Sequence, residues 1–310
     1  MAIHDVADYG PGGWADPGRA DARARACCES LERGDVVLLR SAGAPLHDAD
    51  REFLLSARQA GSSYFKNISY RPEADRVKGV ARGSADVERL RAVLRDCSRR
   101  MVALAGDVLR PYARRWALDF TSFRSIEEEG RPGTLKTRND LLHVDAFPTR
   151  PTNGSLILRV FTNLNPSRER VWLTGPPFEA VAREHAGRAG LGAVAARAGG
   201  ARRRVRRALV RSARSVGLPL RDRSPYDEFM HGFHHYLKAS REFQDGCAKE
   251  RLEFPPGATW MVFTDVVPHA VLSGQFAVEQ TFVVPPDALV APARAPVRVL
   301  ERLCGIPLTS

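Results

Sequence analysis

The chain has 310 residues, of which 44% are hydrophobic, and it carries a formal net charge of +11. This length and composition favour one large globular domain with a sizeable buried core. No run of 18 or more apolar residues occurs, and residues 1–8 lack the basic and apolar regions of a signal peptide, so we expect a cytoplasmic protein that does not span a membrane. The five cysteines are an odd number without metal-ligand spacing, which argues against a disulfide framework.

The positive charge is concentrated in one segment. Residues 202–214 hold the densest group of arginines in the chain, and positive charge at that density attracts the phosphates of nucleic acid or of an anionic lipid surface. A solvated helix or a mobile insert explains the same pattern equally well. We expect no nucleic-acid partner, because the sequence holds no recognised nucleic-acid-binding motif.

The first part of the chain alternates helices with short strands. Apolar stripes at helical spacing predict helices over residues 20–33 and 86–114. Between them, residues 35–40 have the apolar character of a short buried strand, and residues 62–70 form an extended polar and aromatic segment.

From residue 135 onward the pattern changes to strands, at 155–164 and 170–173. Alternation in the first of these puts Ile157, Arg159 and Phe161 on one face, and an Arg on an otherwise apolar face needs an anionic partner. The strand pattern stops over residues 178–223, which are rich in Ala, Gly and Arg, and returns over 260–263 and 279–284.

A helix is predicted to begin at Ser224, with Ser as its N-cap and Pro at the first helical position. Its aromatic stripe is expected to pack against the sheet. Three histidines, His231, His234 and His235, lie on this helix; without a companion carboxylate or Cys pattern they favour surface or substrate contact over metal binding.

The strongest chemical signal is a His-x-Asp pair within an apolar run, at His143 and Asp145. In a strand, residues two apart point to the same side, so the pair would present two metal ligands together. A distant His269 follows the apolar strand 260–263. Two histidines and one carboxylate form the face that holds non-haem Fe(II) and leaves three coordination positions open.

Ligand-bearing segments early and late in a β-rich half suit a double-stranded β-helix, the jelly-roll or cupin barrel. We therefore predict an α+β fold with such a core, flanked by N-terminal support helices and a helical insert. The whole chain, residues 1–310, is expected to form a single domain. Its predicted parts are helical support with the first strands (1–134), the metal-bearing β-core (135–177 and 254–285) and an Arg-rich helical insert (178–253).

Several longer motifs carry a family resemblance. They are residues 66–72 (KNISYRP), 122–124 (SFR), 138–151 (RNDLLHVDAFPTRP), 158–166 (LRVFTNLNP) and 260–275 (WMVFTDVVPHAVLSGQ). These segments resemble the Kdo 3-hydroxylase family, whose members use Fe(II), 2-oxoglutarate and O2 to hydroxylate carbon 3 of 3-deoxy-D-manno-octulosonic acid (Kdo) in Kdo-lipid A. The resemblance runs discontinuously from about residue 62 to 285 and leaves the Arg-rich insert unmatched.

The resemblance implies a set of roles. His143, Asp145 and His269 would hold Fe(II), and 2-oxoglutarate would be converted to succinate and CO2, with ascorbate as the reductant that keeps iron reduced. Polar groups in the matched segments would contact the sugar acid: Lys66, Asn67, Tyr70, Asn139 and Arg150. A lipid-anchored substrate would also give the basic cluster a role at the inner face of the inner membrane.

The far carboxylate of 2-oxoglutarate requires a basic partner. Many such enzymes place it on the strand after the distal His, but residues 273–281 hold no basic residue. The asparaginyl-hydroxylase and Jumonji enzymes place the base on a strand after the His-x-Asp, where this sequence has Arg159. Arg159 is therefore the predicted anchor, Arg138 and Lys136 are its alternatives, and Asn163 is a further predicted contact of the co-substrate.

Two other functions fit parts of the pattern. A 2-oxoglutarate oxygenase acting on a protein or another small anionic substrate would keep the same iron site and change only the substrate pocket. A cupin-like sugar-binding module without catalysis would have no reason to retain an open iron face. Uncoupled conversion of 2-oxoglutarate to succinate distinguishes the enzymes from the binding module.

Overall fold

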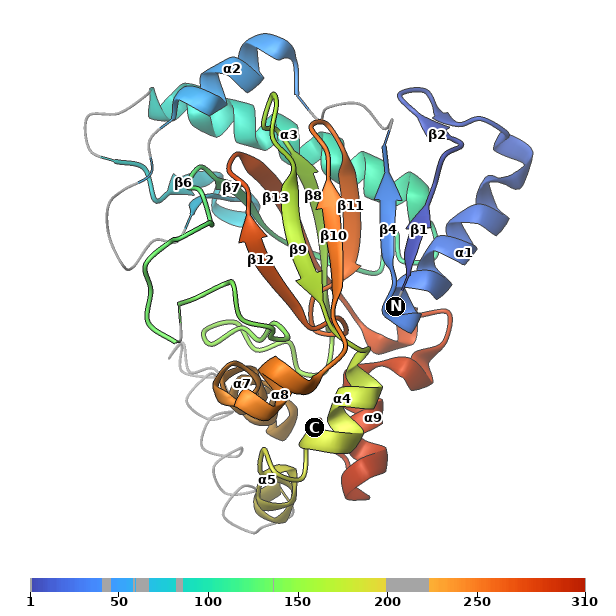
Figure 1. Cartoon of the computed structure of the whole chain (residues 1–310). Helices are drawn as coiled ribbons and strands as arrows, with labels where there is room; N and C mark the ends of the chain where they lie inside the picture. The colour runs from blue at the N-terminus through green and yellow to red at the C-terminus, as the bar shows by residue number, and fades with distance from the viewer. Residues whose placement is uncertain are drawn as a thin grey trace, which may run out of the picture.

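The chain folds as two facing β-sheets with helices outside them (Figure 1). The structure is a computed structural model, and it describes residues 2–40, 46–57, 59, 67–81, 86–135, 137–198 and 223–309. Three groups of sequence predictions fall outside these residues: Lys66, Lys136 and the basic cluster 202–214. No helix in the described ranges is both long and apolar enough to cross a bilayer.

The larger sheet has eight strands in the order β1-β4-β11-β8-β13-β7-β5-β6, and only the β1–β4 pair is parallel. Its strands are β1 (Ile3–Asp5), β4 (Val36–Leu39), β5 (Ile68–Arg71), β6 (Arg76–Lys78), β7 (Ala117–Arg124), β8 (Leu156–Asn163), β11 (Thr259–Phe263) and β13 (Ala277–Val284). The smaller sheet holds β10 (Glu250–Phe254), β9 (Arg170–Thr174) and β12 (His269–Ser273), in that spatial order. A short hairpin of β2 (Tyr9–Gly10) and β3 (Gly13–Trp14) stands apart.

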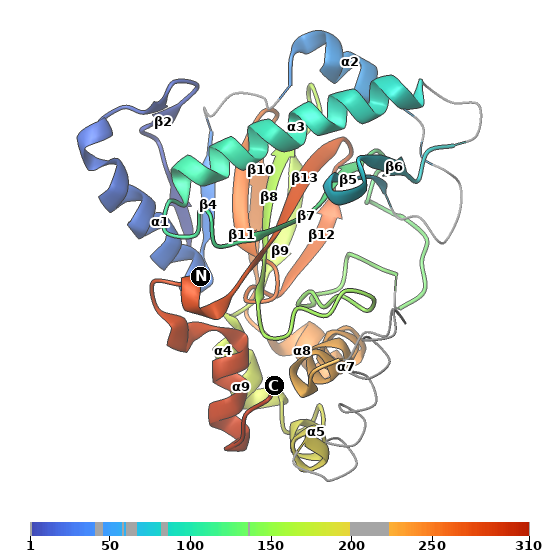
Figure 2. The same cartoon turned by 180° about the vertical axis from the view of Figure 1, so that it is seen from behind.

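Helices lie on one face and at one end of this pair of sheets. Figure 2 shows α3 running across the outer face of the larger sheet, with α1 beside it. The others gather beyond the ends of the strands, except α2 near α3. The α-helices are α1 (Ala20–Arg33), α2 (Asp48–Ser56), α3 (Val87–Val108), α4 (Phe178–His185), α5 (Leu191–Ala198), α7 (Pro225–Ala239), α8 (Arg241–Gly246) and α9 (Pro296–Cys304).

The alternation of β8 separates two hydrophobic cores. Leu158 and Val160 face the helices, whereas Phe161 joins an aromatic core between the sheets with Trp172 and Trp260. Phe161 stacks on Trp260 with ring centroids 5.1 Å apart, and Trp172 meets both rings edge-on. This arrangement confirms the predicted jelly-roll-type core and places Arg159, two residues before Phe161, between the sheets.

Several details differ from the sequence prediction. The His143 segment is not a strand: a single bridge joins His143 to His269, and the amide of Asp145 donates to the Thr264 carbonyl at 2.8 Å. These backbone hydrogen bonds between distant segments, and not regular strand geometry, turn the side chains of His143 and Asp145 to one side. The larger sheet takes strands from both sides of residue 134, since β1, β4 and β5 to β7 precede it and β8, β11 and β13 follow it. The predicted helical insert, residues 178–253, also contains most of a strand, β10.

The helix predicted at Ser224 is present as α7. Ser224 caps it through a reciprocal pair with Asp227, whose amide donates to the Ser224 hydroxyl oxygen at 3.1 Å. Its aromatic stripe packs mainly against helices, not against the sheet as predicted, since Phe233 meets Phe178 of α4 at 6.0 Å and α5 and α8 are its main neighbours.

Candidate active site

The structure brings His143, Asp145 and His269 together between the two sheets. One potential metal-ligand atom from each residue lies within 4.8 Å of the other two. This is the only such group in the described part of the chain. The Nε2 atom of His143 is 3.8 Å from Oδ1 of Asp145. Reciprocal backbone bonds of 3.1 and 2.9 Å tie His143 to His269, which fixes the two rings relative to each other.

Both imidazoles are oriented by backbone carbonyls. Nδ1 of His143 lies 2.7 Å from the Leu141 carbonyl oxygen, and Nδ1 of His269 lies 2.9 Å from that of Val267. A carbonyl only accepts, so each Nδ1 carries the proton and each Nε2 keeps a lone pair. Burial lowers the pKa of both rings, so they are neutral near pH 7, the form that binds a metal.

Asp145 is held as a carboxylate by its surroundings. Burial alone would raise its pKa, but the Arg159 guanidinium is the main cause that holds the pKa far below its usual range. Arg159 Nη2 lies 3.0 Å from Asp145, and Arg159 Nη1 lies 2.6 Å from Glu279. The prediction that Arg159 needs an anionic partner is confirmed, with two partners in place of one.

A small cavity of about 50 Å³ lies beside the three candidate metal ligands His143, Asp145 and His269. Arg170 and Trp172, two residues apart on β9, both face it. Arg170 is fully buried and donates to the Gly274 carbonyl at 2.8 Å, while its Nε and Nη2 have no hydrogen-bond partner among the described residues, and neither does Trp172 Nε1. Burial lowers the pKa of Arg170 to about 10, which still leaves it cationic at neutral pH. Nη2 of Arg170 does lie 3.9 Å from the buried Glu128 carboxylate, an ion pair without a hydrogen bond. Buried donors that lack a hydrogen bond favour an anion.

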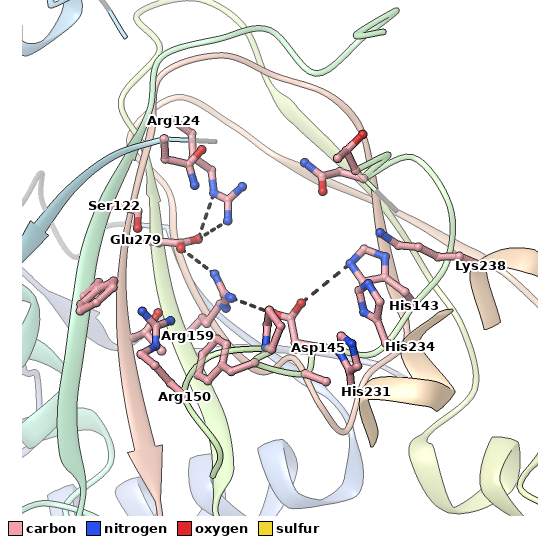
Figure 3. Close-up of a pocket in the computed structure, with 18 of the residues that line it drawn as sticks. Ser122, Arg124, His143, Asp145, Arg150, Arg159, His231, His234, Lys238 and Glu279 are labelled. Atoms are coloured by element: carbon pink, nitrogen blue, oxygen red, sulfur yellow. Dashed lines mark hydrogen bonds and ion pairs between the residues drawn. The ribbon is translucent and has the colours of Figure 1, made fainter. Parts of the chain in front are cut away.

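A larger cavity of about 430 Å³ opens from the same residues (Figure 3). Its wall on the larger sheet carries Arg124, Arg159 and Glu279, and Arg150 lies nearby. The opposite wall is α7, with His231, His234 and Lys238. Four cations and two carboxylates line the cavity in total, so it suits an anionic ligand: Arg124, Arg150, Arg159, Lys238, Asp145 and Glu279.

The other predicted contacts divide into two groups. Asn67, Asn139 and Arg150 line the larger cavity, and Asn139 also lines the smaller one. Arg150 pairs with Asp119 at 3.1 Å and lies over the Phe120 and Phe147 rings. The three histidines of α7 line the larger cavity, in agreement with the substrate-contact alternative.

Three predicted residues line neither cavity. The Arg138 side chain is 41% exposed and pairs with Asp140. Asn163 donates to the carbonyls of Arg168 and Phe254, which braces a turn. Tyr70 is buried and donates to Asp75 at 3.0 Å. In this structure these three side chains bond to other parts of the protein and do not line the two cavities.

Sequence reasoning missed Arg124, Arg170, Trp172, Glu279 and Lys238. Arg170 and Arg124 are charged residues within strands, the same signal that identified Arg159. Their partners come from distant segments, so the sequence did not show what they contact. Arg124 donates two hydrogen bonds to Glu279, at 2.9 and 2.7 Å, across 155 positions of sequence. Only the folded chain shows such pairs.

Comparison with known proteins decides the family. The model of the 3-deoxy-D-manno-oct-2-ulosonic acid (Kdo) hydroxylase family matches residues 15–307. The chain belongs to this family. No curated protein matches its sequence.

Solved structures of the Kdo hydroxylase KdoO, a non-haem Fe(II) alpha-ketoglutarate-dependent dioxygenase, are similar over the whole chain. The cobalt(II) complex of KdoO is 30% identical with a TM-score of 0.83, and the match covers 100% of this chain and 98% of that one. The complex of KdoO with alpha-ketoglutarate (2-oxoglutarate) and Fe(III) is 29% identical with a TM-score of 0.81, at the same coverage. This chain therefore shares the jelly-roll dioxygenase fold of a Kdo hydroxylase.

Proposed function

We propose that this protein hydroxylates carbon 3 of Kdo in Kdo-lipid A, using Fe(II), 2-oxoglutarate and O2 and releasing succinate and CO2. The observation that carries the proposal is the grouping of two neutral imidazoles and one carboxylate at the junction of a small and a large cationic cavity. Family membership supplies the sugar acid and the reaction.

His143, Asp145 and His269 are the proposed iron ligands. Their donor set is the one that non-haem Fe(II) prefers, and both Nε2 atoms are available to a metal. When bound, iron supplies the redox chemistry that couples decarboxylation of 2-oxoglutarate to oxidation of a C–H bond. The protein orients the ligands: the backbone fixes both rings, and Arg159 fixes the carboxylate.

The far carboxylate of 2-oxoglutarate has two candidate partners. Arg159, predicted from the sequence, is buried and close to the ligands, but Asp145 and Glu279 already occupy both of its Nη atoms and only its Nε lacks a hydrogen-bond partner among the described residues. Nε and Nη2 of Arg170 make no hydrogen bond to the described residues, and Nη2 has only the Glu128 carboxylate at 3.9 Å; Trp172 adds a third donor to the same small cavity. We propose that Arg170 binds this carboxylate by charge-assisted hydrogen bonds and that Arg159 holds Asp145 in position.

The larger cavity is the proposed sugar site. A C–H bond carries no charge by which a protein can orient it, so the sugar must be positioned through its carboxylate, hydroxyls and neighbouring phosphates. Asn67 and Asn139 offer hydrogen-bonding groups there, and Arg150 offers a positive charge. Lys66 stays a predicted contact.

The lipid anchor of the substrate motivates a membrane partner. We propose that the protein works in the cytoplasm, peripherally at the inner face of the inner membrane, with the basic cluster 202–214 attracted to anionic lipid. The test is sedimentation with anionic vesicles after all five arginines between positions 202 and 207 are replaced by Gln. Unchanged binding would remove the cluster from this role.

The decisive experiment is mass spectrometry of Kdo-lipid A incubated with the purified protein, Fe(II), 2-oxoglutarate and ascorbate. We expect a gain of one oxygen on Kdo that is absent with the His143→Ala variant. Succinate without sugar oxidation would indicate an oxygenase with another substrate. If folded, iron-loaded protein forms neither succinate nor oxidised Kdo, that result would contradict an enzymatic role.

A further inference from the structure

The hairpin of β5 and β6 carries three cations on one face. Arg71 and Arg76 lie directly opposite each other in the hairpin register, and Lys78 lies two positions beyond Arg76 on the same face. No carboxylate in the described ranges forms an ion pair with any of the three. Like charges at neighbouring positions of a hairpin repel each other, so this face favours an anion from outside the hairpin.

The acidic residues of the hairpin do not compensate these cations. Asp75, in the turn, pairs with Arg91 and Arg95 of α3, each at 3.0 Å, on the other side of the sheet. Glu73 is exposed and makes no ion pair within the described part of the chain. The charges of Arg71 and Arg76 lower the pKa of Lys78, as expected for three neighbouring cations. We call Arg71, Arg76 and Lys78 the hairpin cations.

The hairpin cations share a sheet face with the wall of the larger cavity. Ser69 of β5 lies opposite Ser122 of β7, and Ser122 lines that cavity together with Asn67 and Arg124. Side chains two apart in a strand point to the same side, so Arg71 follows Asn67 and Ser69 on the cavity side. Figure 2 shows β5 and β6 beside β7, at the edge of the larger sheet.

An aromatic ring joins the hairpin cations to the cavity. The guanidinium of Arg71 lies over the Phe120 ring, 4.6 Å from its centroid, and that of Arg150 lies over the same ring at 4.0 Å. Phe120 and Arg150 both line the larger cavity. A contact with a ring face orients a guanidinium without using its N–H donors. Arg71 is therefore a positioned cation directly outside the cavity wall.

The distance from the iron ligands decides which part of a substrate could meet these cations. Neighbouring strands lie about 4.8 Å apart, so β6 is about 10 Å beyond the cavity wall on β7. A single sugar acid with its reacting carbon at the ligands is too short to reach that far. An anion bound here must belong to a part of the substrate beyond the sugar acid.

The residue types indicate the kind of anion. Arginine binds phosphate through two parallel N–H donors, and lysine adds a compact point charge. Two arginines and one lysine on one face therefore suit a group that carries more than one negative charge, such as a phosphate monoester. In Kdo-lipid A the groups of this chemistry beyond the sugar acid are the phosphates of the lipid A part.

We propose that the hairpin cations form a phosphate subsite, which binds a phosphate of the lipid A part while Kdo occupies the larger cavity. This inference rests on the proposed function and deepens it, because the subsite selects the phosphorylated lipid over its dephosphorylated form. The contact is remote from the reacting carbon, so it strengthens binding of the ground state and the transition state equally and lowers KM without changing kcat.

The test compares two lipids and three proteins. The lipids are Kdo-lipid A and the same lipid after enzymatic removal of its phosphates, both in micelles of a non-ionic detergent. The proteins are the wild type, the triple Gln variant of the hairpin cations, and a control variant with the same loss of charge. The control changes three exposed arginines that line neither cavity, Arg99→Gln, Arg241→Gln and Arg294→Gln.

The first measurement is lipid binding to the protein loaded with 2-oxoglutarate and Co(II), a metal that KdoO also binds. We expect the wild type and the control to bind the phosphorylated lipid about 10- to 100-fold more tightly, the range for hydrogen bonds to charged groups. The hairpin variant should bind both lipids about equally. With Fe(II), the same preference should appear in KM and not in kcat.

Urea unfolding checks that the hairpin variant folds. Its midpoint should be at least that of the wild type, because the substitutions remove a repulsion between neighbouring cations. A matching midpoint assigns the lost preference to the subsite.

Three outcomes would overturn the inference. The wild type could bind both lipids equally, or the hairpin variant could keep the preference. Alternatively, the hairpin variant could lose binding to anionic phospholipid vesicles that contain no Kdo-lipid A, which would assign the cations to membrane headgroups. A preference in binding without any oxidation of Kdo would support the subsite and contradict only the proposed function.

Discussion

Arg159 joins the carboxylate of Asp145, at 3.0 Å, to that of Glu279, at 2.6 Å, in the interior between the two sheets. Glu279 in turn accepts two hydrogen bonds from Arg124. Two cations and two carboxylates thus form one buried network, in which the charges compensate each other. Asp145 Oδ2 is used by this network, and Oδ1 is left facing His143.

This network predicts different roles for two buried arginines. Arg159→Met should weaken metal binding by about 10- to 100-fold, because Asp145 loses the partner that orients it. Arg170→Met should leave Co(II) binding unchanged and weaken the binding of 2-oxoglutarate by roughly 100- to 4,000-fold, the effect of about 3–5 kcal/mol for a lost buried charge partner. Metal and co-substrate titrations of both variants measure this. If Arg159→Met weakened 2-oxoglutarate binding and Arg170→Met did not, Arg159 would be the partner of the far carboxylate.

The metal site predicts that each ligand is needed separately. Replacing His143, Asp145 or His269 by Ala should abolish stoichiometric binding of Fe(II) or Co(II), since two donors do not hold these ions against water in an open site. Equilibrium dialysis measures the metal bound. His47→Ala is the matched control, because His47 is exposed and does not belong to the ligand group. Full metal binding by any one ligand variant would contradict the assignment.

Trp172 offers an optical signal from the same site. Its ring stacks on His269 with centroids 5.2 Å apart and an interplanar angle of 22°. Co(II) on His269 should therefore quench tryptophan fluorescence, and most of the quenching should disappear in Trp172→Phe. The control Trp116→Phe, which changes a ring packed on Phe282, should show the same quenching as the wild type. Equal quenching in wild type and Trp172→Phe would place the metal elsewhere.

The metal-free protein should lose stability in mild acid, and His234 should contribute. Burial, with the charge of Lys238, lowers the pKa of His234 from 6.5 to about 4. The unfolded chain then binds more protons than the folded one between these values, so the contribution is complete above pH 6.5 and is lost as the pH falls toward 4. The loss should be on the order of 3 kcal/mol for this shift.

Urea unfolding of wild type and His234→Gln across that pH range tests this expectation. Gln keeps a donor for the Val144 carbonyl, which now lies 2.8 Å from the histidine Nδ1. The difference between the two proteins cancels the contribution of every other titrating group. A difference in stability that does not change with pH would show that His234 titrates normally.

The sequence by itself determined the chemistry of the protein. His143-x-Asp145 and the distant His269 predicted the donor set, and the apolar strand segments and the long motifs predicted the core and the family. Local patterns were sufficient because strand alternation in β8, helix capping at Ser224 and ligand type are properties of neighbouring residues, although the His143 segment itself is not a strand. Arg159 followed from the same logic, since a charge on an apolar strand face must be paired inside the protein.

The tertiary structure alone decided which residues share a cavity. Arg170, Trp172 and Lys238 come from a strand and a helix that sequence reasoning did not connect to the ligands, and Glu279 pairs with arginines more than a hundred positions away. Asn163 and Arg138, close to the ligands in sequence, turned out to serve local structure. Sequence neighbours report local geometry, whereas burial and charge pairing depend on which distant segments the two sheets bring together.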